Sequence, residues 1–230
     1  MALAAVVHPT RKRRNQYHHG DLRHALIQEA VRTIETGGVA ALTLRAVGHS
    51  LGVSRTALYR HFADKSALLA AVGREGFRAF KDELTIAAKV GAGRVGFKAM
   101  GRAYVRFAVT HPAHYRVMFG GFLEACESEP ELEQEAAASF HVLVDAIVAQ
   151  QQAGLLRPDA PAQMAGFVWA IVHGIAMLTI DGQLGDRDPN AEVDYALQRL
   201  STGITAPHSR RTDPGVRVSA AGRCRPMRQQ

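Results

Sequence analysis

Hydrophobic residues recur every three or four positions along most of this chain, and this spacing predicts helices. The first helix is expected from Asp21 to about Thr36, where Gly37 and Gly38 end it. Its apolar positions, spaced by four, are Leu22, Leu26, Ala30 and Ile34. Because such a stripe must be buried, this helix should pack beneath the elements that follow it.

Further helices are expected along the rest of the chain, several with a capping residue or a proline near the start. They are expected from about Asp64 into the eighties, at about Val95 to Thr110, from Pro112, at about Glu131 to Ala153, from Pro161 to about Gln183, and after Asn190. The pattern therefore predicts an all-α fold.

The stretch from Thr43 to Phe62, TLRAVGHSLGVSRTALYRHF, predicts two short helices separated by a tight turn. Thr43 is a suitable N-cap for the first helix, and Gly52 permits the backbone conformation that ends it. Ser54 caps the second helix, which exposes arginine and small residues and buries a Leu and Phe stripe. A helix with one basic, exposed face and one apolar, buried face is suited to the major groove of DNA.

The exposed side chains of this stretch carry groups that bind bases and phosphates. Arg55 suits a guanine edge, Thr56 can serve more than one base, and Ala57 suits a thymine methyl. The hydroxyl, imidazole and ammonium groups that follow are typical phosphate contacts. The candidate DNA-binding residues are Thr43, Arg45, Ser54, Arg55, Thr56, Ala57, Tyr59, Arg60, His61 and Lys65. The spacing alone also allows a solvated helix hairpin in an all-α enzyme.

Charge is unevenly distributed along the 230 residues, whose formal net charge is +7. Residues 1–20 carry +4, residues 21–65 carry +2, residues 66–206 carry −4 and residues 207–230 carry +5. This distribution is expected when only part of a chain meets a polyanion. We therefore expect four segments: a disordered basic arm (1–16), a helix-turn-helix domain (17–65), a helical body (66–206) and a disordered basic tail (207–230). Either basic end could contact DNA or remain a solvated tail.

Cysteine usage and the N-terminus indicate a cytoplasmic protein. Cys126 and Cys224 are the only cysteines and lack the CxxC spacing, which argues against a disulfide scaffold or a structural zinc site. The N-terminus does not resemble a signal peptide. The uncharged segment 160–180 approaches the length of a membrane span, but Pro161, Gln163 and His173 interrupt it, so we expect a buried interface helix.

Three other sequence patterns could suggest a dinucleotide site, a metal site or a catalytic site, but each lacks a required feature. Residues 91–96, GAGRVG, match GxGxxG, but no strand precedes them, so we expect a connecting loop. His111 and His114 lack a carboxylate or cysteine beside them, so we expect no metal, and we expect no cofactor. Histidines, serines, Asp145 and Asp181 do not form a nucleophile, base and orienter at a recognisable spacing, so we expect no enzyme.

The run LTLRAVGHSLGVSRTALYRHFADKSALL resembles the DNA-binding domain of the TetR family of bacterial transcriptional regulators, over about residues 17–69. The residues that carry this resemblance are Thr43, Gly52, Val53, Ser54, Leu58, Tyr59, His61, Phe62, Lys65 and Leu68. Farther along, HPAHYRVMF together with Trp169, His173 and Gly174 is similar to a C-terminal ligand-binding subclass of that family with a WHG signature. This second resemblance covers about residues 95–200.

The resemblance implies a homodimer on double-stranded DNA, most often a repressor that binds a palindromic operator and is released by a small-molecule effector. The last two helices, rich in Ala, Gly and Ile, look able to form the dimer interface. Candidate effector-binding residues are Phe97, Met100, Tyr104, Phe107, Tyr115, Met118, Phe119, Phe140, Trp169, His173 and Met177, for each of which plain core packing is the alternative. Two other functions remain: an architectural DNA binder without an effector, and a helical enzyme of unknown chemistry.

Overall fold

The computed structural model describes residues 19–91, 93–123 and 129–204, and within these ranges every regular element is a helix. The helices are α1 (His19–Ala41), α2 (Leu44–Ser50), α3 (Arg55–Tyr59), α4 (Lys65–Ala88), α5 (Gly93–Thr110), α6 (Pro112–Phe119), α7 (Pro130–Gln152), α8 (Pro161–Ile180) and α9 (Pro189–Ile204). The expected all-α fold is confirmed. The basic arm, the basic tail and both cysteines lie outside the described residues.

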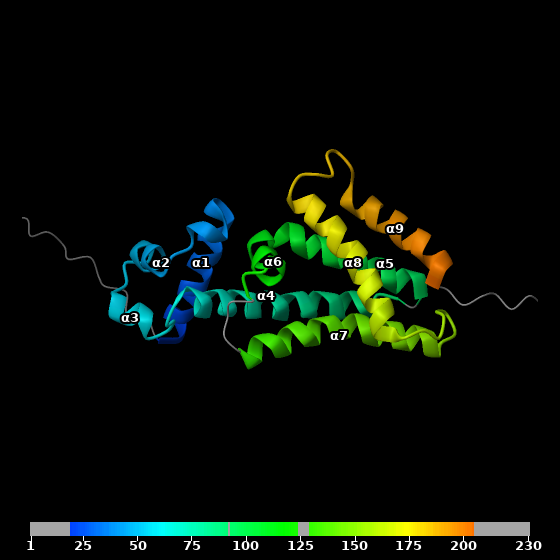
Figure 1. The fold of residues 1–230 in the computed structure, drawn as a ribbon, viewed down its shortest axis with the longest axis horizontal. Coiled ribbons are helices and arrows are strands. Elements are labelled where there is room, and N and C mark those ends of the chain that lie inside the picture. The colour runs from blue at the N-terminus through cyan, green and yellow to red at the C-terminus, as the bar shows by residue number, and fades with distance from the viewer. Residues whose placement is uncertain (1–18, 92, 124–128, 205–230) are drawn as a thin grey trace, which may run out of the picture.

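The molecule is elongated, with a small head of α1 to α3 at one end and a larger helical body at the other (Figure 1). The long helix α4 runs from the head into the body, and α7 lies along it. Helix α8 packs on α5, α7 and α9. A helix-turn-helix head followed by a helical body is therefore the observed architecture.

Two hydrophobic cores meet along α4. Leu68 and Val72 belong to the head core, whereas Phe80 and Leu84 belong to the body core. Helix α6 is also shared, because one of its faces enters the head core and the other faces the body. The head core consists of Leu22, Leu26, Ile27, Ala30, Val31, Ile34, Val39, Leu42, Leu44, Val47, Leu58, Phe62, Leu68, Leu69, Ala71, Val72, Ala113 and Val117. The head and the body thus share two helices rather than a flexible linker.

The expected break of the first helix is confirmed, whereas the expected loop over residues 91–96 is wrong from Gly93 onward. Gly38 leaves the helical conformation with φ 73° and ψ 172°, and a short helical segment beyond this kink carries α1 on to Ala41. At the other position α5 begins at Gly93, and Gly96 lies buried inside it. The many glycines of this segment favoured a loop. The structure gives another reason for Gly96: it lies so close to the Gly91 carbonyl that a side chain would not fit there.

Two glycines, Gly73 and Gly76, lie inside α4. Both are buried, and a methyl group at Gly76 would stand 2.6 Å from Sδ of Met118. At Gly73 the same atom would stand 3.0 Å from Cδ1 of Leu123. These glycines therefore allow α6 and its following segment to approach α4 closely.

Helix α8 is long and apolar enough, by length and composition alone, to cross a membrane. Only 28% of its most apolar window is buried inside the molecule. Phe167 is 53% exposed and Leu178 is 41% exposed. The expected interface helix is therefore only partly covered by its own chain.

Candidate nucleic-acid interface and effector site

Short side chains fix the start of each helix around the turn. Oγ1 of Thr43 accepts a hydrogen bond from the Ala46 amide at 3.1 Å, and Oγ of Ser54 accepts one from the Ala57 amide at 3.2 Å. These contacts satisfy amides that the first turn of a helix leaves unpaired. Both expected N-caps are confirmed, and they set where α2 and α3 begin.

The turn between α2 and α3 is compact because two glycines permit it. Gly52 has φ 64°, a conformation that glycine adopts without strain, and the Val53 amide donates to the Gly48 carbonyl at 3.0 Å. Gly48 is buried, and a methyl group there would stand 3.3 Å from Cδ1 of Leu58. Glycine at this position lowers the stability of α2, but because it has no side chain it lets α3 pack closely on α2.

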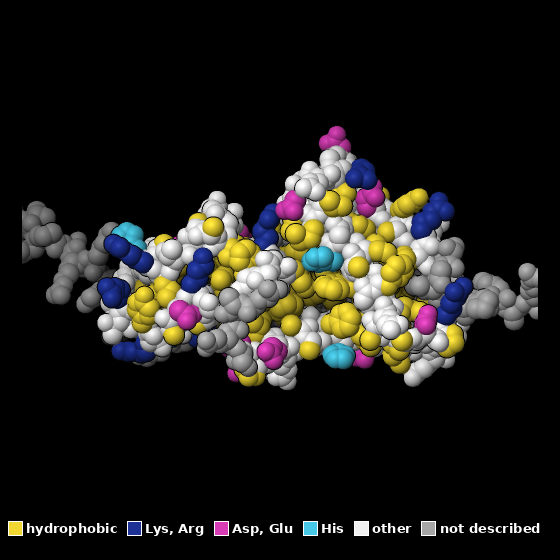
Figure 2. Space-filling view, viewed as in Figure 1, with side chains coloured by type: hydrophobic (Ala, Val, Ile, Leu, Met, Phe, Trp, Pro, Cys, Tyr) yellow, Lys and Arg dark blue, Asp and Glu magenta, His cyan; other side chains and the backbone are white. Residues whose placement is uncertain are grey.

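The predicted DNA contacts lie on one end of the head. The exposed residues are Thr43, Arg45, Ser54, Arg55, Thr56, Tyr59 and Arg60, whereas Ala57, His61 and Lys65 are half-buried. In the described part of the chain, Arg45, Arg55 and Arg60 have no hydrogen-bond or ion-pair partner, whereas many body arginines and lysines are paired with carboxylates. Figure 2 shows Lys and Arg side chains over this end. The head thus presents guanidinium groups that are free to bind an anion.

Lys65 differs from the other predicted contacts. Its ammonium donates to the Val39 carbonyl at 2.9 Å, so it ties the end of α1 to the first turn of α4. Beside it, Oδ1 of Asp64 accepts from the Ala67 amide at 2.8 Å and caps α4 as expected. The ammonium has two further hydrogens that could reach a phosphate.

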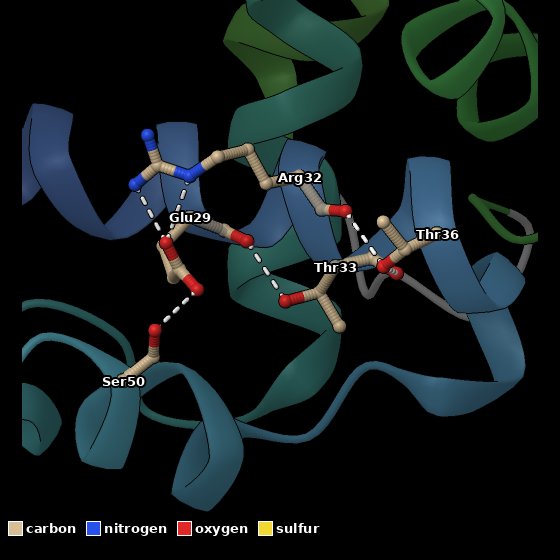
Figure 3. A network of polar contacts seen from close by, with 5 residues as sticks. All are labelled: Glu29, Arg32, Thr33, Thr36 and Ser50. Carbon is tan, nitrogen blue, oxygen red and sulfur yellow. Dashed lines mark hydrogen bonds and ion pairs between the residues drawn. The ribbon is translucent and has the colours of Figure 1, made fainter.

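A polar contact that the sequence did not indicate orients α2 on α1. The hydroxyl of Ser50 donates to Oε1 of Glu29 at 2.6 Å, and the guanidinium of Arg32 donates to Oε2 of Glu29 at 2.6 and 2.9 Å (Figure 3). The Ser50 hydrogen bond, followed by Arg32, lowers the pKa of the Glu29 carboxyl. Because Ser50 and Glu29 are 21 positions apart on different helices, no local sequence pattern could reveal their contact.

In the body, four of the predicted effector-binding residues form a hydrogen-bonded cluster, which we call the polar cluster: Tyr104, Tyr115, Trp169 and His173. The Tyr115 hydroxyl lies 3.0 Å from the Tyr104 hydroxyl and 2.7 Å from Nδ1 of His173. The Tyr104 hydroxyl lies 3.1 Å from the same nitrogen and accepts from Nε1 of Trp169 at 2.9 Å. Three helices, α5, α6 and α8, contribute to the polar cluster.

Burial determines the protonation of the polar cluster. Loss of solvent raises the pKa of both tyrosine hydroxyls and lowers the pKa of His173. The tyrosines therefore stay protonated and the imidazole stays neutral near pH 7. The cluster is polar without carrying a charge.

The remaining predicted effector-binding residues fall into three groups. Phe119 and Phe140 place their rings 6.3 Å from the ring of Trp169 and surround the polar cluster. Phe97 and Met100 line a cavity of about 30 Å³ together with Tyr104. Phe107, Met118 and Met177 pack in the body core. The cavity is also lined by Leu84, Gly101, Leu143, Val168, Val172 and Leu197, which the sequence did not single out.

Comparison with known families matches both parts of the chain. Residues 26–72 match the family described as "Bacterial regulatory proteins, tetR family". Residues 97–200 match the family described as "Tetracyclin repressor-like, C-terminal domain".

Individual relatives extend over both matched regions. An uncharacterized helix-turn-helix-type transcriptional regulator of Mycobacterium tuberculosis is 28% identical over 204 residues, which is 86% of each chain. A solved structure of a protein with unknown function from Rhodococcus sp. RHA1 is 32% identical with a TM-score of 0.75, covering 83% of this chain and 98% of that one. A TetR family transcription regulator from Marinobacter aquaeolei shares the fold with a TM-score of 0.63 at 19% identity, covering 80% of this chain and 96% of that one.

Proposed function

The chain belongs to the TetR family of DNA-binding transcriptional regulators, and from this premise we propose that it is a repressor that binds a palindromic operator as a homodimer in the cytoplasm and is released by a small molecule. The observation that carries the DNA-binding part is a set of arginines without an ion-pair partner among the described residues: Arg45 on α2, Arg55 on α3 and Arg60 directly after α3. Arg55 in the first turn of α3 is the residue that we assign to a guanine edge, because guanidinium binds O6 and N7 together.

The exposed face of α8 supports a dimer. Phe167 and Leu178 are exposed on α8, and Tyr195 on the neighbouring α9 is 59% exposed. Figure 2 shows hydrophobic side chains on the side where α8 lies in front. An apolar surface of this kind is unusual on a monomer, and a second copy of the same two helices would cover it symmetrically. Two heads could then reach half-sites about 34 Å apart, or a multiple of that spacing.

Helix α6 offers a route from the effector site to the head. Tyr115 of the polar cluster and Phe119 face the body core, whereas Ala113 and Val117 on the same helix are buried in the head core. A molecule that binds among the rings and favours another position of α6 would change how the head sits on the body. By linkage, that molecule then weakens DNA binding, and DNA weakens its binding.

Selection of bound duplexes from random DNA tests this proposal. A palindromic product with half-sites about one helical turn apart is the expected result. The variant Arg55→Ala should lose preference at one base position in each half-site, at a cost of about 1–3 kcal/mol. Arg106→Ala is the matched control, because it removes the same charge from α5, where Glu83 already pairs with the guanidinium. If the two variants behave alike on the selected duplex and on random DNA, the assignment of Arg55 fails.

An architectural DNA binder without an effector is the second candidate. Its expected signature is a shallow base preference with a steep salt dependence. Selection that returns no consensus sequence, although the protein binds DNA at low salt, would favour it.

A further inference from the structure

The polar cluster has one hydrogen-bonding group that its own members do not use. The triangle formed by the two tyrosine hydroxyls and Nδ1 of His173 holds two hydroxyl hydrogens, and Nδ1 must accept one of them. The neutral imidazole therefore carries its hydrogen on Nε2. Among the described residues Nε2 has no hydrogen-bond partner, and no fully buried side-chain nitrogen or oxygen lacks one, so Nε2 of the half-buried His173 is not fully buried.

Protonating His173 would break this arrangement. A hydrogen on Nδ1 would have to point at Tyr115, whose own hydrogen would then point at Tyr104. The Tyr104 oxygen already accepts from Trp169, and its hydrogen would have no acceptor within the polar cluster. The geometry thus keeps the imidazole neutral, with a single outward N–H donor.

Aromatic rings lie beside the His173 ring. The ring centroids of Phe119 and Trp169 lie 5.2 and 5.4 Å from the centroid of His173, and the ring centroid of Phe140 lies 6.3 Å from that of Trp169. Trp169 is 36% exposed, so these rings are accessible rather than sealed. They come from α6, α7 and α8. Flat apolar molecules bind such walls by ring contacts and by loss of water.

No charged side chain of the described residues bonds to the polar cluster. Arg116, on the same helix as Tyr115, instead donates to the Ile180 carbonyl at 3.2 Å and to Asp181 at 2.8 Å. An anionic ligand placed among the rings would therefore lose water without gaining a counter-charge from the described residues. A cationic ligand, although aromatic rings attract cations, would face the N–H donor of His173 instead of an acceptor. An uncharged ligand avoids this cost.

From these observations, and resting on the effector response proposed above, we infer that the site formed by Phe119, Trp169 and His173 takes a neutral, planar, largely apolar molecule whose acceptor oxygen binds the outward N–H of His173. A carbonyl, ether or amide oxygen fits this requirement. The apolar cavity of about 30 Å³ behind Tyr104 has room for only about one water molecule, so the ligand's ring lies against the aromatic wall rather than in that cavity.

Three naphthalene probes of similar shape test the inference by equilibrium dialysis at pH 7.5 with the full chain. They are 2-acetonaphthone, with a neutral acceptor oxygen, 2-ethylnaphthalene, without one, and 2-naphthoate, with a charged one. The acetyl compound should bind about two- to tenfold more tightly than the ethyl compound, the range of one neutral hydrogen bond, and naphthoate should bind most weakly. Equal binding of acetyl and ethyl compounds, or tightest binding of naphthoate, would overturn the inference.

Variants at position 173 assign the donor. His173→Phe should bind both neutral probes equally, whereas His173→Gln, which keeps an N–H near the position of Nε2, should restore part of the preference. His141→Phe removes an exposed histidine from α7 and should change nothing. If His173→Phe does not fold, the rank order of the three probes on the unaltered protein decides by itself. If the protein selects an operator but binds none of the probes, the proposed ligand class is refuted, whereas the proposed function as a DNA-binding regulator is not.

Discussion

Replacing Glu29 by glutamine should weaken operator binding although it makes the head more positive. The carboxylate holds the Ser50 hydroxyl at 2.6 Å and so fixes α2, and through the turn α3, on α1. Glutamine keeps an oxygen that can accept from Ser50 but loses the charge that strengthens the bond. A hydrogen bond to a charged group contributes about 1.5–3 kcal/mol and a neutral one about 1 kcal/mol, so we expect a loss of about 1 kcal/mol.

The ion pair with Arg32 adds little to this estimate. The Arg32 side chain is 61% exposed and lies three residues along the same helix, where such pairs contribute about 0.3–0.5 kcal/mol. If the whole loss appears as misorientation of α3, affinity falls about fivefold for each head, and about thirtyfold for a dimer that places both heads on the operator. Fluorescence anisotropy with a labelled operator at fixed salt measures this change.

Glu35→Gln provides the matched control. Glu35 is an exposed residue of α1, and the substitution adds the same charge to the head without touching α2. Electrostatic attraction alone predicts that both variants bind DNA slightly more tightly than the unaltered protein. The structure instead predicts that Glu29→Gln binds DNA more weakly than the unaltered protein, whereas Glu35→Gln binds it slightly more tightly. If Glu29→Gln binds as tightly as Glu35→Gln, the proposed orienting role of Glu29 is refuted.

The pH dependence of stability gives an independent measure of the same contact. The folded-state pKa of Glu29 is lowered, so its contribution to the free energy of unfolding is present above its unfolded pKa of about 4.3 and is lost as the pH falls through the folded value. The difference in stability between the unaltered protein and Glu29→Gln should therefore be constant near pH 7 and shrink below about pH 4.3. Urea unfolding at several pH values measures it, and a difference that does not change with pH would contradict this origin.

Three further substitutions probe the body. Tyr115→Phe removes a fully buried hydroxyl from the polar cluster and should lower the free energy of unfolding by about 1 kcal/mol, measured in urea. Gly101→Val should cost about 1–3 kcal/mol by overpacking, because even a methyl group at Gly101 would stand 2.9 Å from Cδ1 of Leu197 and Cγ1 of Val193; an unchanged melting temperature would show that α9 can shift freely. Phe167→Glu, at a position 53% exposed, should leave stability within about 0.5 kcal/mol but yield a monomer by sedimentation, and a persistent dimer would place the interface elsewhere.

The helices and caps were predictable because their signals are local. Thr43, Ser54 and Asp64 each accept a hydrogen bond from an amide three residues later, so a short sequence window contains both partners. The buried stripe of α1 likewise repeats every four residues. Features whose partners lie within three or four residues of one another can be predicted from a single helix, without knowing what packs on it.

The long-range parts of the site were only partly predictable. The residues of the polar cluster were individually expected near an effector, but the bond between Trp169 and Tyr104 joins positions 65 apart and depends on how α5 and α8 cross. The sequence predicts a phosphate contact for Lys65, whereas its bond to the Val39 carbonyl joins positions 26 apart. Tertiary packing, which no local pattern encodes, decided these contacts.

The sharing of α6 between the two cores limits how heads and bodies can be exchanged among related regulators. Ala113 and Val117 are encoded with the body, yet both are buried in the head. A chimera cut in the loop before α4 would bring a foreign helix against the grafted head and leave mismatched side chains at the seam. A transplant that carries these two α6 positions and the head-core positions of α4, such as Leu68 and Val72, together with the new head should tolerate the exchange far better. The boundary for recombination therefore follows the packing and not the order of residues along the polypeptide.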